Sequence, residues 1–146
     1  MRSVAYCVLV LTLLGCINRT SQALDQALIP YMWVPATADC EGADCADMWQ
    51  RAQVWVAKHS KWKLQTATDV LLQTYSPATA DVSYSFNILK EPTGAGRYSI
   101  RMGMSCGNIF GCSPSQDQVR RAFIYYVMKG KDLLDQFSGY GLGAIH

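Results

Sequence analysis

Residues 82–106 alternate apolar and polar side chains on both sides of a turn that contains proline and glycine. The apolar members of this alternation are Val82, Tyr84, Phe86 and Ile88 before the turn, and Tyr98, Ile100, Met102 and Met104 after it. Alternation with a period of two on both arms predicts a β-hairpin with one buried face. Because a two-stranded ribbon is not stable alone, the rest of the chain must supply more strands and a cover for the apolar face.

The same alternation places polar side chains on the opposite face of the hairpin. These residues are Ser83, Ser85, Asn87, Ser99 and Arg101. Their hydroxyl, amide and guanidinium groups would form a flat or concave polar surface, which is suited to a glycan or to a partner protein. The alternative is a face that is simply solvated, since antiparallel sheets often leave one face in water.

Two segments have the periodicity of helices that cover a sheet. Residues 46–59 place Met48, Ala52, Trp55 and Val56 on one helical face. A second helix begins with Ser113 as its cap, Pro114 at its first position and Gln116 completing a capping box. Its apolar spacing continues across Gly130, where we expect a kink or break, and ends at Ser138 or Gly139.

The remaining strands are shorter. Residues 28–34 are apolar and contain Pro30, which favours an edge strand. Residues 35–44 are predicted to form a loop. Residues 63–75 are predicted to form either one long strand with a bulge or two short strands joined by a tight turn, and we favour the two short strands, which make a four-strand meander with the hairpin. The predicted fold is therefore α+β: residues 24–146 form one domain, in which both helices cover one face of a curved antiparallel sheet.

Residues 1–23 have the features of an export signal. Arg2 precedes an apolar run at residues 4–14, which is too short for a permanent transmembrane helix. Residues 13–16, with the sequence Leu-Leu-Gly-Cys, resemble the bacterial lipobox and predict lipidation at Cys16. Residues 21–23, Ser-Gln-Ala, would instead suit ordinary signal peptidase and release a lipid-free chain that begins at Leu24.

Four cysteines remain after either cleavage: Cys40, Cys45, Cys106 and Cys112. An even number in an exported chain predicts two disulfides, and the spacings differ from those of structural zinc sites. An even number of strands between the two helices would place the two cysteine pairs at opposite ends of the sheet. Since a disulfide needs α-carbons within about 7 Å, we expect the local pairs Cys40–Cys45 and Cys106–Cys112.

Charge and histidine content argue against two classes of function. Loss of Arg2 with the signal lowers the formal net charge from +2 to +1, and loss of Arg19 as well lowers it to zero. Such a chain offers no basic surface for nucleic acid. The only histidines are His59 and His146, so a histidine-activated nucleophile is hard to build. We predict no enzymatic activity, no metal and no cofactor.

Several segments together look like a family of small bacterial envelope domains of unknown function, whose fold is similar to that of the TATA-box-binding protein. They are Trp33-Val34-Pro35, residues 48–55, Leu64-Gln65 and Tyr84-Ser85-Phe86. The resemblance implies a curved sheet with both helices on one face, and it implies neither DNA binding nor catalytic residues. The sequence therefore predicts an envelope lipoprotein that faces the periplasm, a non-enzymatic binding or assembly module that meets the membrane only through its lipid anchor. The alternative is a soluble periplasmic or secreted factor, such as an inhibitor stapled by two disulfides.

Overall fold

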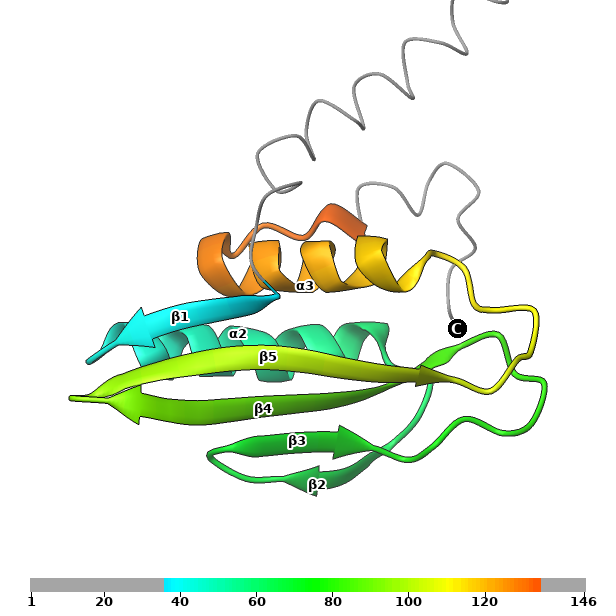
Figure 1. Cartoon of the computed structure of the whole chain (residues 1–146), viewed down its shortest axis with the longest axis horizontal. Coiled ribbons are helices and arrows are strands. Elements are labelled where there is room, and N and C mark those ends of the chain that lie inside the picture. Colours follow the sequence, from blue (N-terminus) through cyan, green and yellow to red (C-terminus); the bar gives the residue numbers. More distant parts are fainter. Residues whose placement is uncertain (1–35, 135–146) are drawn as a thin grey trace, which may run out of the picture. The chain divides into compact units, whose positions relative to one another are not determined.

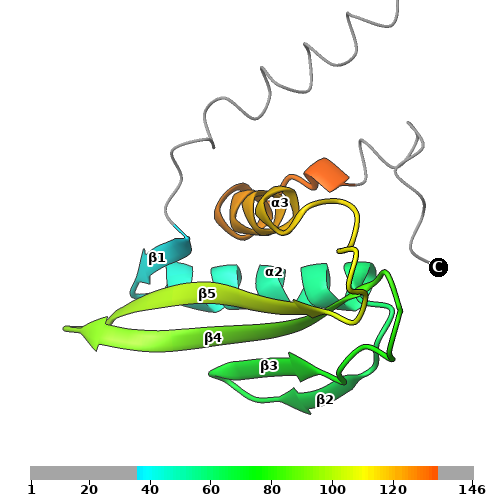
Figure 2. The same ribbon diagram turned by 45° about the vertical axis from the view of Figure 1, so that its right-hand side comes forward.

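The computed structural model describes residues 36–134 of the 146-residue chain. In order, its elements are β1 (Thr37–Glu41), α2 (Asp44–His59), β2 (Leu64–Ala67), β3 (Leu71–Thr74), β4 (Tyr84–Gly94), β5 (Arg97–Cys106) and α3 (Gln116–Lys129). The strands form one antiparallel sheet in the order β1-β5-β4-β3-β2. Both helices lie on the same face of this sheet (Figures 1 and 2), which confirms the predicted α+β architecture.

The long hairpin of β4 and β5 is the centre of the sheet. Its strands pair from Tyr84 opposite Cys106 to Gly94 opposite Arg97. Ala95 and Gly96 form the connection, and both have positive φ, at 50° and 73°. Two consecutive left-handed residues are typical of a tight hairpin turn whose twist matches that of the strands. The strands therefore reach further into the proline- and glycine-containing segment than the alternation predicts.

The hydrophobic core forms between the hairpin and the helices. Tyr84, Phe86, Ile88, Ile100 and Met102 are buried as predicted, whereas Tyr98 and Met104 are only partly buried. Trp55 of α2 is fully buried, and its ring meets Phe86 at 5.5 Å and Phe123 of α3 at 5.3 Å between centroids. One aromatic side chain thus connects the sheet to both helices. The prediction was wrong for Val82, which precedes β4 and is 60% exposed.

The strand β1 corrects the prediction of a loop at residues 35–44. Its sequence, Thr-Ala-Asp-Cys-Glu, has little intrinsic preference for strand structure. It nevertheless pairs with the free edge of β5, from Thr37 opposite Arg101 to Glu41 opposite Arg97. Only Ala38 and Cys40 face the core, so no large apolar residue marks the strand in the sequence. The edge strand predicted at residues 28–34 lies outside the described residues.

The structure confirms the central residues of both predicted helices, but the residues at which the helices begin differ from the prediction. α2 begins two residues before the predicted start, at Asp44, and buries the predicted apolar face. In α3 the cap is Ser115, which forms a capping box with Gln118, so the predicted cap at Ser113 and Gln116 was wrong by two residues. Gly130 ends α3 with a left-handed conformation at φ 71°. The predicted helix end at Ser138 or Gly139 lies outside the described residues.

The two short strands predicted within residues 63–75 are confirmed as β2 and β3. Between α2 and α3 the chain thus makes four strands, and the disulfides are the local pairs that this even number predicts: Cys40–Cys45 and Cys106–Cys112. The predicted export signal and the predicted lipidation site at Cys16 lie outside the described residues. Within that part, no helix is long and apolar enough to cross a membrane.

Candidate binding surfaces

The face of the sheet opposite the helices divides into two halves. In the half made by β1, β5 and the turn-proximal part of β4, the predicted residues already have partners within the chain. The Ser99 hydroxyl donates to Asp39 Oδ1 at 2.7 Å, and Arg101 Nη2 donates to Glu91 Oε1 at 2.8 Å. This half is therefore a cross-strand network of paired polar groups, as expected for a solvated face.

The prediction that Ser83 and Ser85 are solvent-facing was wrong, because they are only 7% and 8% exposed. The segment between β3 and β4 folds back against the end of β5, where the Ala80 N–H donates to the Gly107 carbonyl at 2.9 Å. This leaves the start of β4 with little access to water. Ser83 accordingly belongs to this packed end of the sheet, with its N–H donating to Asp81 Oδ1 at 2.8 Å.

The second half of the open face contains a hollow of about 360 Å³, which we call the polar hollow. Its lining comes from three neighbouring strands and includes Gln73, Ser85, Asn87, Gly103 and Ser105. Asn87 lies opposite Gln73 on one side and opposite Gly103 on the other. A Cβ atom at Gly103 would stand 3.6 Å from the Asn87 carbonyl oxygen, which is an ordinary contact. A side chain would therefore fit at position 103, and its absence keeps the hollow open.

The chemistry of the polar hollow is neutral and rich in hydrogen-bonding groups. The side chains of Gln73, Ser85, Asn87 and Ser105 form no hydrogen bond to any other residue that the structure describes. No charged residue contributes to the lining. By contrast, the Thr74 hydroxyl on the core side is used internally and accepts from the Phe86 N–H at 2.9 Å. The hollow thus offers free amide and hydroxyl groups to a neutral ligand.

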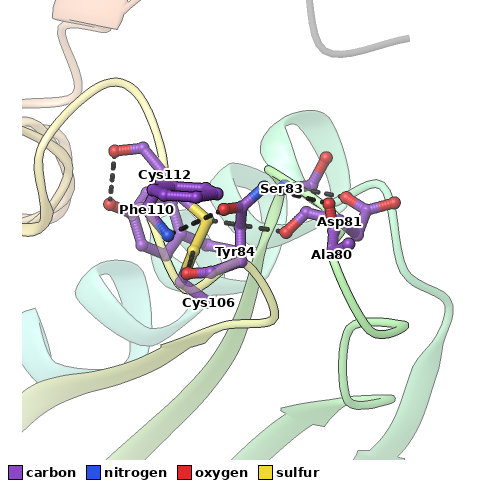
Figure 3. The surroundings of a disulfide bond; sticks show 8 residues. Ala80, Asp81, Ser83, Tyr84, Cys106, Phe110 and Cys112 are labelled. Carbon is purple, nitrogen blue, oxygen red and sulfur yellow. Dashed lines mark hydrogen bonds between the residues drawn. A yellow bond between two sulfur atoms is a disulfide. The ribbon is translucent and has the colours of Figure 1, made fainter.

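A second surface is the loop closed by the Cys106–Cys112 disulfide, which we call the clamped loop (residues 106–112). Figure 3 shows this disulfide with Tyr84, Ala80, Asp81 and Ser83 beside it. The Tyr84 hydroxyl donates to the Cys112 carbonyl at 3.1 Å, and burial raises the pKa of Tyr84. Asn108 Nδ2 donates to the Ala80 carbonyl at 3.1 Å. The loop is therefore attached both to β4, through Tyr84, and to the segment between β3 and β4, through Ala80.

Close backbone packing also holds the clamped loop at its base. A Cβ atom added to Gly107 would lie 2.2 Å from the Ala78 carbonyl oxygen, so only glycine fits there. Asp81, in the same supporting segment, pairs with Lys61 at 2.5 Å. The hydrogen bond from Lys61 and the Ser83 N–H lower the pKa of Asp81 against a smaller effect of desolvation. Asp81 therefore carries a paired carboxylate within the segment that supports the loop.

Ile109 and Phe110, at the apex of the clamped loop, form what we call the apolar tip. They are 92% and 94% exposed, the highest values among the large apolar residues that the structure describes. The Phe110 N–H donates to Asn108 Oδ1 at 2.9 Å, and the Gly111 N–H donates to the Asn108 carbonyl at 3.1 Å. The sequence prediction missed these residues. The available signal was an Ile-Phe pair inside a short cystine loop, where polar residues are usual.

His59 has a structural role at the end of α2. Its Nε2 lies 2.7 Å from Asp132 Oδ2, and its ring packs on Trp55 at 4.6 Å between centroids. Burial raises the pKa of Asp132, but hydrogen bonds and charges from His59 and Lys58 outweigh it, so that the pKa is lowered overall.

Across residues 36–134, no cluster of three or more His, Cys, Asp or Glu is placed to hold a metal ion.

Comparison of the chain with protein-family models, with curated proteins and with solved structures finds no match. The resemblance to small envelope domains with a TATA-box-binding-protein-like fold therefore stays a prediction.

Proposed function

We propose that the chain is an exported bacterial envelope lipoprotein, tethered through Cys16, that acts as a non-enzymatic binding module. Its ligand is neutral and rich in hydroxyl or amide groups, as a glycan is, and binds in the polar hollow. This proposal rests on one observation: the side-chain amides and hydroxyls around Gly103 form no hydrogen bonds to other described residues. A glycine inside a strand often marks a bulge, a bend, or a place where a ligand or another backbone approaches closely, and no bulge interrupts the pairing of Gly103 with Asn87.

The size and charge of the polar hollow support this class of ligand. Its volume of about 360 Å³ is near the lower end of the usual range for ligand sites, roughly 300–1,000 Å³. Because no charged side chain lines it, an ionic ligand would gain no pairing there. Side-chain amides and hydroxyls can each donate and accept, which suits the hydroxyl and acetamido groups of a sugar.

The proposed location depends on the cysteines and on the leader. Two disulfides suit an oxidising compartment such as the periplasm. The lipobox-like residues 13–16 would place a diacylglyceryl group on Cys16 and hold the domain on the envelope membrane, facing the periplasm. Cleavage after Ala23 is the alternative and would yield a soluble periplasmic or secreted factor.

Filling the hollow tests the binding proposal. We expect wild-type protein to bind N-acetylglucosamine oligomers or soluble peptidoglycan fragments in isothermal titration calorimetry. Gly103→Val should weaken binding at least tenfold, because its side chain occupies the floor of the hollow. Ser99→Val is the matched control, since it adds a branched side chain to the same face outside the hollow. Equal binding by Gly103→Val, or no binding of either probe by the wild type, would contradict the proposal.

The intact mass of the mature protein, recovered from its native envelope with and without reductant, tests the tether. We expect a chain that begins at Cys16 and carries a diacylglyceryl group, with four protons gained on reduction. A lipid-free chain beginning at Leu24 would remove the anchor and make the soluble factor the better account.

A further inference from the structure

We infer that the apolar tip, Ile109 and Phe110, inserts into the interfacial region of the lipid bilayer to which the domain is tethered. This inference rests on the proposed lipid anchor at Cys16. It assigns a second contact with the membrane, made by the folded domain itself, and it fixes which side of the domain faces the bilayer.

The apolar tip is more exposed than the other apolar residues on the described surface. Single apolar side chains are common on protein surfaces and are usually partly covered. The other large apolar residues exposed in the described part of the chain range from 40% at Met128 to 60% at Val82. Ile109 and Phe110 are adjacent in sequence and almost completely exposed. Together they form a small apolar projection that no other part of the described chain covers.

The tip is also pre-organised. The disulfide closes the loop, and Asn108 orders its apex by accepting from the backbone N–H groups of Phe110 and Gly111. The base is held by Tyr84 and Ala80. Because these contacts already fix the loop, insertion costs little further conformational entropy.

The composition of the loop suits an apolar environment. Residues 106–115 contain no charged side chain. The N–H groups of Phe110 and Gly111 are satisfied within the loop. Entry of the tip into the interface therefore buries no charge and leaves neither of these donors without a partner, two conditions that a lipid environment imposes.

The small size of the tip favours a bilayer over a protein pocket. A specific protein interface usually buries at least about 1,200 Å² in total, far more than two side chains supply. A bilayer requires no complementary shape. Only 20 residues separate Cys16 from the start of β1, a span of at most about 70 Å. Such a tether gives an effective concentration of about millimolar, at which a weak contact is populated.

The test uses mature lipoprotein reconstituted in vesicles of phosphatidylethanolamine and phosphatidylglycerol that contain lipids brominated at a shallow depth. Phe110→Trp adds a fluorophore at the tip, and its signal is taken relative to the wild-type background. We expect brominated lipids to quench this added fluorescence at least twofold. Met128→Trp is the control, because Met128 is exposed at the far end of α3 from the clamped loop. Its added fluorescence should be unquenched.

A second variant and the mass of the same sample separate the possible failures. Ile109→Ser in the Phe110→Trp background should reduce the quenching and leave the melting temperature unchanged, because the tip lies outside the core. A lipid-bearing mass without quenching overturns the inference and leaves the tether intact. A dimer that is lost on Ile109→Ser/Phe110→Ser, seen by sedimentation velocity in detergent, would make the tip a contact between copies and also overturn it. A lipid-free mass overturns the tether and this inference together.

Discussion

The two cystine loops are nearly equal in length but differ in what they do. Cys40 and Cys45 are five residues apart and buried, and their bridge joins the end of β1 to the first turn of α2 within the core. Cys106 and Cys112 are six residues apart and lie at the rim of the core. Cys40 lies opposite Tyr98, near the start of β5, and Cys106 is the last residue of β5.

The two disulfides differ in what they contribute to the folded protein. Loop closure restricts the unfolded chain by a similar amount in both cases, about 2 kcal/mol for loops of this length. The difference therefore comes from the folded state. In the first loop the two cysteines are buried, and the connecting residues 41–44 are exposed and include no large apolar side chain. In the second, the connecting residues include the apolar tip. The first disulfide is part of the hydrophobic core, whereas the second closes a loop that exposes apolar side chains to solvent.

The largest effect should come from breaking the buried bridge. Cys40→Ala/Cys45→Ala should lower the free energy of unfolding by about 3 kcal/mol, of which about 2 kcal/mol comes from loop closure and the rest from lost contacts of the buried sulfurs. Urea denaturation of the oxidised proteins measures this loss. If the loss equals that of the second bridge, burial of the sulfurs has no effect on stability.

Breaking the second bridge should have a smaller effect on stability and a larger one on the loop. Cys106→Ala/Cys112→Ala should lower the free energy of unfolding by about 2 kcal/mol. The amides of residues 107–111 should then exchange with solvent faster, while those of α2 keep their protection. Hydrogen exchange followed by mass spectrometry distinguishes the two regions, and unchanged exchange in the loop would show that the hydrogen bonds alone hold it.

Removing one support of the clamped loop should have an effect of about 1 kcal/mol. Tyr84→Phe deletes the hydroxyl that donates to the Cys112 carbonyl and leaves that carbonyl without this donor. Thermal unfolding measures the change. Tyr75→Phe, at an exposed tyrosine, is the control and should melt like the wild type. A wild-type melting temperature for Tyr84→Phe would show that the buried hydroxyl contributes nothing.

The smallest effect concerns pH. Because the pKa of Asp81 is lowered in the folded state, its carboxylate stabilises the protein above the ordinary pKa of about 3.9. This contribution should be lost as the pH falls through the lowered value. Asp81→Asn should therefore flatten the acid limb of the stability profile and loosen the clamped loop near neutral pH. An acid limb that is identical in the variant would contradict the assigned role of Lys61 and the Ser83 N–H.

Strong local signals predicted most of the fold. The alternation in residues 82–106 identified the hairpin, and the spacing of Met48, Ala52, Trp55 and Val56 identified α2. Such patterns can be recognised in the sequence because one face of each element must be apolar. β1 has no such pattern: its two inward positions are small, and the edge of β5 decides its conformation. The capping error in α3 has a similar origin, since two overlapping capping patterns, at Ser113 and at Ser115, occur in the same short segment.

The candidate binding residues were predicted less completely. Alternation correctly separates the open face from the core face, but it carries no information on what lies over each strand. Ser83 is therefore found buried at the packed end of the sheet, and Ser85 is only 8% exposed although it lines the polar hollow. Ser99 and Arg101 are found in pairs with Asp39 and Glu91. Of the five predicted residues, Ser85 and Asn87 line the polar hollow.

The sequence alone determined the alternating hairpin, the two amphipathic helices and, through the number of strands, the local pairing of the cysteines. These properties depend on neighbours along the chain, whose spacing is fixed by the geometry of helices and strands. The tertiary structure decided the strand β1, the polar hollow around Gly103 and the exposure of Ile109 and Phe110. Each of these depends on which distant segment occupies the space beside a residue. Local patterns carry little of that information, and for the apolar tip the one local signal is the Ile-Phe pair inside a short cystine loop.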